Sequence, residues 1–132
     1  MDLQQFIGKK GVVETIVKES ETAMAFGSGS IAVFSTPNMI GLMENAALNL
    51  AQPLLDEGYT TVGTSVNIVH LAATPIGVKV KAEAELIHVD GKKIEFRVIV
   101  WDEIEKIGEG THQRFIVNAS RFMGKAGSKI VI

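Results

Sequence analysis

Residues 35–55 predict a long helix around which the fold is built, and they read Ser-Thr-Pro-Asn-Met-Ile-Gly-Leu-Met-Glu-Asn-Ala-Ala-Leu-Asn-Leu-Ala-Gln-Pro-Leu-Leu. Its apolar side chains recur with the period of an α-helix, and further apolar residues lie on the opposite side. Ser35-Thr36-Pro37 is typical of a helix start, because Ser and Thr cap free N–H groups and proline is tolerated in the first turn. Pro53 is expected to disturb the last turn, and Gly58 to end the helix. A helix that is apolar almost all round is expected to be buried.

Strand patterns surround this helix in the sequence. Residues 11–18 are rich in β-branched side chains, and residues 22–26 are a candidate partner strand. After the helix, strands are expected over residues 61–71, 78–89, 94–101 and 107–117. Asp90-Gly91 predicts a tight hairpin. One or two strands, a long helix and then a meander of about four antiparallel strands favour an α+β fold, in which a curved sheet wraps around one central helix.

The bulk composition fits one small domain. The chain has 132 residues, a formal net charge of -2 and no cysteine, so disulfides, thiolate metal sites and a cysteine nucleophile are excluded. The weak charge gives no reason to expect nucleic acid as a partner. We find neither a signal-peptide pattern nor an apolar run of the roughly 18 residues that span a membrane, so a cytoplasmic protein is expected.

We therefore predict a single domain over residues 1–132, with residues 119–132 as a C-terminal extension. The composition of this extension after Phe122 is typical of a loop. One chain of this size is not expected to cover both faces of its sheet, so we expect a homodimer.

Glu44 is the strongest candidate for chemistry, because it is the only charged residue between Pro37 and Leu55. A carboxylate in a buried helix is costly unless it is paired, and desolvation raises the proton affinity of such a group toward that of a general base. The alternative is a structural carboxylate that reaches the surface. Thr36 lies at the start of the same helix, where N–H groups and the helix dipole could hold an oxyanion. Its alternative role is that of a helix cap alone.

Other candidates come from the strands. His70 ends an apolar strand and shares a face with Val66 and Ile68, which is compatible with a core histidine or with a site at the strand end. His112 and Arg114 share a face of the last predicted strand, where Arg suits recognition of a carboxylate, a phosphate or a carbonyl oxygen. A surface position for these two residues is an equal alternative. His88 is expected to be solvated.

Several kinds of site are excluded by spacing. The three histidines lack the close spacing of a zinc pair, so no metal site is expected. Gly27-Ser28-Gly29-Ser30 lacks the Lys-Ser/Thr continuation of a phosphate-binding loop. No Gly-x-Ser-x-Gly elbow is present, which excludes an α/β-hydrolase.

Four segments together resemble a known family. They are Phe34-Ser35-Thr36-Pro37, Met43-Glu44-Asn45-Ala46-Ala47, Gly63-Thr64 with His70–Gly77, and the ending Gly108-x-Gly110-x-His112-x-Arg114. In this order they look like the fluoroacetyl-CoA-thioesterase-like branch of the hotdog-fold thioesterases, over roughly residues 10–118. The resemblance implies a hotdog fold and a dimer with active sites near the subunit interface.

The resemblance also implies roles for individual residues. It implies that Thr36, Glu44 and His70 cooperate in hydrolysing an acyl-CoA thioester, and that Gly63 and Arg114 contact the substrate. Coenzyme A would enter only as part of the substrate, with no separate cofactor. Whether Glu44 attacks directly or activates a water stays open, as does the acyl group.

Other activities of the same fold remain as alternatives. A non-catalytic module that binds acyl-CoA or another small ligand is one, because fold does not determine function. Enoyl-CoA hydration is disfavoured, because the early helix reads Pro37-Asn38-Met39-Ile40 and lacks the Asp or His that this chemistry requires.

Overall fold

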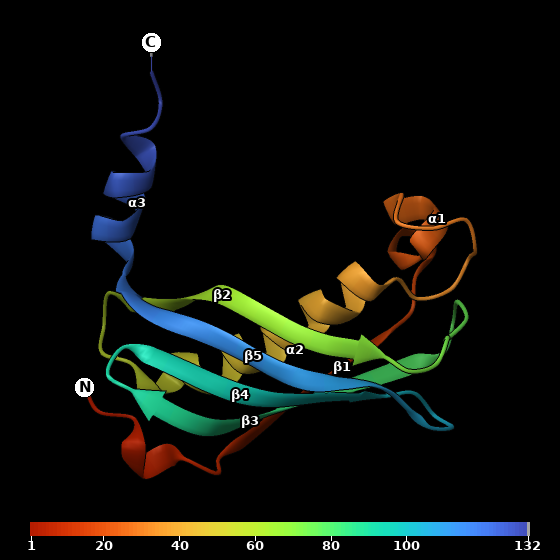
Figure 1. Cartoon of the computed structure of the whole chain (residues 1–132), viewed down its shortest axis with the longest axis horizontal. Helices are drawn as coiled ribbons and strands as arrows, with labels where there is room; N and C mark the ends of the chain where they lie inside the picture. The colour runs from red at the N-terminus through yellow and green to blue at the C-terminus, as the bar shows by residue number, and fades with distance from the viewer. Residues whose placement is uncertain (132) are drawn as a thin grey trace.

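The computed structural model describes residues 1–131, and in them one antiparallel sheet wraps around a long helix (Figure 1). The sheet has the strand order β1-β3-β4-β5-β2. Its strands are β1 (Lys10–Ile16), β2 (Tyr59–His70), β3 (Lys79–Asp90), β4 (Lys93–Trp101) and β5 (Lys106–Asn118). The helices are α1 (Ala23–Phe26), α2 (Thr36–Ala51) and α3 (Ala119–Gly127), with short 3-10 turns η1 (Gln4–Phe6), η2 (Glu19–Glu21) and η3 (Gln52–Leu54). None of these helices is long and apolar enough to cross a membrane.

Helix α2 forms the centre of the core, as its sequence predicts. Ser35 caps the helix, because its hydroxyl accepts a hydrogen bond from the Asn38 N–H at 3.1 Å. The helix ends at Ala51 rather than at Gly58 as expected, because Pro53 turns the chain into the 3-10 turn that follows. The helix packs against β1, β3 and β4. Its buried residues are Met39, Met43, Ala46, Ala47, Leu50 and Ala51.

Three further expectations about local structure are wrong. Residues 22–26 do not form a strand, because Thr22 caps the short helix α1 by accepting from Ala25 N–H, and β1 pairs with β3 instead. The four later strands do not form a simple meander, since β2 crosses to pair with β5. The segment after Phe122 is not a loop at first, because α3 continues to Gly127.

Strand β2 forms one edge of the sheet. It pairs with β5 on one side, and its register shifts between Gly63 and Ser65, so Thr64 is an extra bulged residue. Residues 63–67 are all exposed, although they lie in the middle of the strand. An unpaired edge of this length offers free N–H and C=O groups to another strand.

Candidate active site

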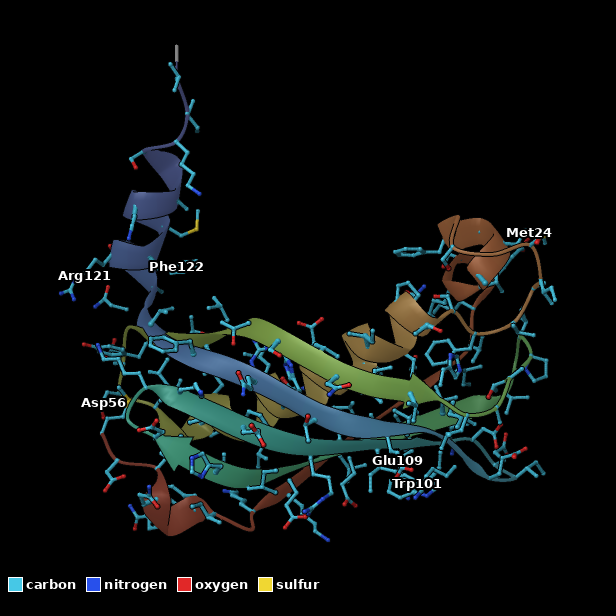
Figure 2. The ribbon with its side chains drawn as sticks, viewed as in Figure 1. Met24, Asp56, Trp101, Glu109, Arg121 and Phe122 are labelled. Atoms are coloured by element: carbon cyan, nitrogen blue, oxygen red, sulfur yellow. The ribbon has the colours of Figure 1, made fainter. Side chains whose placement is uncertain are left out.

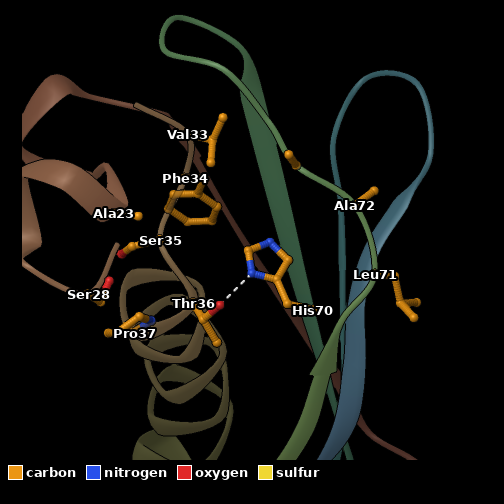
Figure 3. Close-up of a pocket in the computed structure, with 11 residues that line it drawn as sticks. Ala23, Ser28, Val33, Phe34, Ser35, Thr36, Pro37, His70, Leu71 and Ala72 are labelled. Carbon is orange, nitrogen blue, oxygen red and sulfur yellow. Dashed lines mark hydrogen bonds between the residues drawn. The ribbon is translucent and has the colours of Figure 1, made fainter. Parts of the chain in front are cut away.

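Thr36 and His70 are in direct contact. Thr36 Oγ1 lies 2.7 Å from His70 Nδ1, which joins the start of α2 to the end of β2 (Figure 3). Because Ser35 supplies the cap, the Thr36 hydroxyl is not used for capping and can bind the imidazole. The expectation that Thr36 could be a cap alone is therefore wrong.

A cavity of about 450 Å³ opens at this contact. Bonds from Phe34 N–H to Thr74 C=O at 2.8 Å and from Ala23 N–H to Val33 C=O at 2.8 Å hold its walls together. Its lining is mostly small or apolar and consists of Ala23, Ser28, Val33, Phe34, Ser35, Thr36, Pro37, His70, Leu71, Ala72 and Ala73. Phe34 is 1% exposed, so its ring belongs to the core behind the cavity.

Burial favours the neutral form of the His70 imidazole. Burial lowers its pKa below the usual 6.5, and the backbone of Ala72 opposes this only in part. Nε2 is buried and has no hydrogen-bond partner within residues 1–131. An unsatisfied buried nitrogen costs about 1–3 kcal/mol, so a ligand or a water that pairs with it gains affinity.

Glu44 lies in a second group, farther along α2. Its Oε2 is 3.8 Å from Arg114 Nη1, and a Cβ atom placed on Gly63 would lie 2.7 Å from that oxygen. The sheet backbone therefore comes so close to the carboxylate that a side chain at position 63 would displace it. The predicted residues Glu44, Gly63 and Arg114 are thus brought together by the fold.

Arg114 is held by a buried network that the sequence only hints at. Its Nε donates to Thr61 Oγ1 at 2.7 Å and its Nη2 donates to Thr61 C=O at 3.0 Å. Its Nη1 lies 3.1 Å from His112 Nε2, while His112 Nδ1 lies 2.9 Å from Ser65 C=O. The carbonyl can only accept, so His112 carries its proton on Nδ1 and accepts from Arg114 through Nε2.

The environment keeps His112 neutral. Its side chain is 1% exposed, and burial lowers its pKa. The Ser65 carbonyl opposes that shift, Arg114 adds to it and Glu44 opposes it. Burial also lowers the pKa of Arg114 while Glu44 raises it, and the guanidinium stays charged. The alternative that His112 and Arg114 lie on the surface is wrong.

One chain does not bring the two groups together. Thr36 and Glu44 are eight positions apart on α2, which is about 12 Å along a helix axis. Within residues 1–131, no hydrogen bond joins Glu44 to Thr36 or His70, and the Glu44 side chain is 41% exposed. The prediction of a desolvated carboxylate beside His70 is therefore wrong for the isolated chain.

Comparison with known proteins identifies the family. Residues 17–120 match the family described as FlK, fluoroacetyl-CoA-specific thioesterase. The fluoroacetyl-CoA thioesterase of Streptantibioticus cattleyicolor is 39% identical over 97 residues, which are 74% of this chain and 70% of that protein. The chain belongs to the FlK thioesterase family. Its membership confirms the predicted family and class of enzyme, a thioester hydrolase.

Solved structures of FlK confirm the hotdog fold. One structure of the fluoroacetyl-CoA thioesterase FlK, which concerns its activity and substrate specificity, superposes with a TM-score of 0.88 at 33% sequence identity. The superposition covers 95% of this chain and 97% of the FlK chain. A phenylalanine-to-alanine variant of FlK in complex with fluoroacetate and CoA gives a TM-score of 0.84 at 32% identity, covering 88% and 98%.

Sequence reasoning missed two members of the buried network, Thr61 and the Ser65 carbonyl. Thr61 lies directly opposite Ile116 on β5, and only the register of the β2–β5 pair shows that its side chain faces Arg114. Because side chains alternate along a strand, Thr61 and Gly63 lie on the same face of β2, and Gly63 is paired with Arg114 on β5. Had the β2–β5 register been predicted, this alternation would have indicated that Thr61 lies close to Arg114.

Proposed function

We propose that this protein is a homodimeric acyl-CoA thioesterase that hydrolyses small acyl-CoA thioesters to the free acid and CoA. The observation that carries the proposal is the 2.7 Å contact between Thr36 and His70 at a small cavity. A short acyl group fits such a cavity. A cytoplasmic location and the absence of a separate cofactor are parts of the same proposal.

The thioester carbonyl would be bound at the start of α2. Thr36 N–H has no hydrogen-bond partner within residues 1–131, since the cap uses the N–H of Asn38. It and the Thr36 hydroxyl are candidate donors to the oxyanion of the tetrahedral intermediate. The hydroxyl is free to donate when His70 carries its proton on Nδ1 and donates to Thr36 Oγ1.

Glu44 and His70 would handle the remaining steps. Glu44 either attacks the carbonyl carbon or takes a proton from a water that attacks it. In the first route, cleavage of the C–S bond leaves a mixed anhydride between the acyl group and Glu44, and a water then hydrolyses it to the free acid. In the second route, the tetrahedral intermediate collapses directly to the acid as the C–S bond breaks. Both routes consume one water, whose hydroxyl ends in the acid and whose proton ends on the CoA thiolate. With its proton on Nδ1, His70 carries none on Nε2, which is buried and has no hydrogen-bond partner within residues 1–131. This nitrogen is the candidate group that takes up the proton released from water and then passes it to the CoA thiolate.

The free edge of β2 supports the proposed dimer. Two identical edge strands related by a two-fold axis perpendicular to the sheet pair antiparallel and join two sheets into one. The exposed stretch 63–67 is the natural centre of that pairing. It carries Val66, which is 38% exposed in one chain.

The same pairing would bring Glu44 near a second His70. Within β2, Gly63 and His70 are seven positions apart, which is about 23 Å along a strand. A pair centred on residue 65 places the partner's His70 across from residue 60, about 10 Å along the strand from Gly63. We therefore propose that each active site combines Glu44 of one subunit with Thr36 and His70 of the other.

Thiol release from a panel of short, branched and aromatic acyl-CoAs tests the proposal. We expect turnover with short acyl groups, and a loss of about 10²–10⁴ in kcat/KM for Thr36→Val, Glu44→Ala and His70→Ala, because each removes a group that acts in the transition state. Circular dichroism should show an unchanged fold. Binding of every acyl-CoA without turnover would overturn the proposal in favour of a ligand-binding module.

A further inference from the structure

Helix α3 has an apolar face that its own chain does not cover. Ala119, Phe122, Met123 and Ala126 follow the spacing of one helix face, and no residue of α3 is buried. Phe122 is 43% exposed and Met123 is 65% exposed. The helix projects away from the sheet (Figure 1). Apolar side chains on a projecting helix are typical of a surface that meets another molecule.

The position of α3 is fixed by the start of β2. Ala119 N–H donates to Gly58 C=O at 2.9 Å, and Gly58 directly precedes the first residue of β2. The other end of β2 carries His70, and the residues after it, Leu71 to Ala73, line the cavity. In one chain, α3 and the cavity therefore lie at opposite ends of β2.

Two-fold pairing of β2 brings these opposite ends together. This step rests on the proposed dimer. A pair centred on residue 65 places Gly58 across from residue 72 of the partner, so that the first turn of α3 lies beside the partner's cavity. Moving the centre by one residue moves this position by two, which still falls on or next to the lining segment.

The surface around the cavity suits an apolar, basic helix. Leu71, which lines the cavity, is 53% exposed. The segment between the lining residues Ala23 and Val33 carries three more exposed apolar side chains: Met24 at 56%, Phe26 at 56% and Ile31 at 68%. Directly before α1, η2 contributes Glu19 and Glu21, whereas α3 contains Arg121 and Lys125 and no acidic residue. Figure 2 shows Met24 and Phe122 at opposite ends of the same chain.

We propose that α3 of each subunit covers the mouth of the partner's Thr36–His70 cavity, with Phe122 and Met123 packed against the partner's α1. Each acyl-CoA then binds between two subunits, one supplying the cavity and the other supplying its outer wall. The C-terminal helix is a part of the substrate site rather than an appendage.

Cysteine cross-linking tests the contact directly, because the chain has no native cysteine. We expect mild oxidation of the double variant Met24→Cys/Met123→Cys to give a covalent dimer that a reductant dissolves. The two single variants are controls and should stay uncross-linked. A double variant that sediments as a dimer but forms no cross-link would overturn the inference.

Kinetics of the full-length protein give a second test. We expect Phe122→Ser/Met123→Ser to raise KM for short acyl-CoAs about tenfold while kcat changes less than about twofold, because α3 touches bound substrate but no reacting atom. Ile104→Ser removes an apolar side chain that is 85% exposed in the β4–β5 turn and is the matched control. An unchanged KM would overturn the inference even if hydrolysis is confirmed, and a monomer in sedimentation would overturn both the dimer and this contact.

Discussion

At Gly63, side chains of neighbouring residues already occupy the space where a Cβ atom would lie. A Cβ atom there would lie 2.7 Å from Glu44 Oε2, 3.2 Å from His112 Cε1 and 3.4 Å from Arg114 Nη1. Its backbone φ is not in the left-handed region, so the cost of Gly63→Ala comes from these contacts alone. The half-exposed carboxylate of Glu44 can move away. We therefore expect a melting temperature within a few degrees of wild type but a fall of about 10–100-fold in kcat, measured by thiol release.

Gly41 is the matched control for this substitution. It lies on α2 three positions before Glu44, and a Cβ atom there meets nothing within 4 Å. Gly41 is exposed, so Gly41→Ala should stabilise α2 by about 1 kcal/mol and leave turnover unchanged. If Gly63→Ala keeps full activity, the position of the Glu44 carboxylate does not matter for the reaction.

His112 makes the folded protein sensitive to acid. Burial lowers the pKa of His112, and likewise that of His70, below the usual 6.5. Below that pH the unfolded chain therefore binds more protons than the folded chain does. The stability that these groups contribute is fully present above about pH 6.5 and is lost as the pH falls through the window beneath it. We expect the melting temperature to fall between pH 7 and pH 5, and to fall less in His112→Gln.

The choice of glutamine keeps an acceptor for Arg114 while removing the titrating ring. His88 is exposed, and His88→Gln is the matched control for replacing a histidine by glutamine. An equal drop in melting temperature for His112→Gln and wild type would show that protonation of His112 does not contribute to acid unfolding.

At the scale of elements, the pattern of the sequence predicts what is regular. The buried helix, its start at Ser35, the turn at Gly91 and the four later strands all follow from apolar periodicity and turn residues. The ends of these four strands fall within about two residues of the prediction, whereas the helix ends at Ala51, before the expected stop at Gly58. The short segment from Ala23 to Phe26 fails because its apolar side chains fit either a helix or a strand. A local hydrogen bond from the Thr22 cap decides between them.

The order of the strands depends on contacts between distant residues. Nothing in the local pattern of residues 59–70 shows that this strand pairs with β5 rather than with the next strand in sequence. That pairing is what places Gly63 beside Arg114 and leaves the opposite edge of β2 free. The layout of the site depends on such distant contacts too. The sequence identifies Thr36, Glu44 and His70 as candidates, but only the three-dimensional arrangement shows that they fall into two groups.

At the level of the whole molecule, a symmetric dimer could bring together the two groups of site residues that lie apart in one chain. The chain presents one group at the end of β2, where Thr36 meets His70, and the other near its middle, where Glu44 meets Arg114. Antiparallel pairing of two β2 strands across a two-fold axis brings the end of each β2 closer to the middle of its partner's β2, so the dimer contains two such places. The proposed dimer with two composite sites needs only this one contact between β2 edges. An active monomer would exclude this arrangement.

Mixing two inactive variants tests whether the site is shared. In a heterodimer of Glu44→Ala and His70→Ala subunits, one composite site has the intact Glu44 of the second subunit and the intact Thr36 and His70 of the first, while the other site has lost both groups. Random exchange makes half of the dimers mixed, so we expect recovery of about a quarter of wild-type activity after unfolding and refolding the variants together. Refolding each variant alone is the control and should recover nothing. If each chain carried a complete site, every site in the mixture would lack one group, and activity would stay at the level of the single variants.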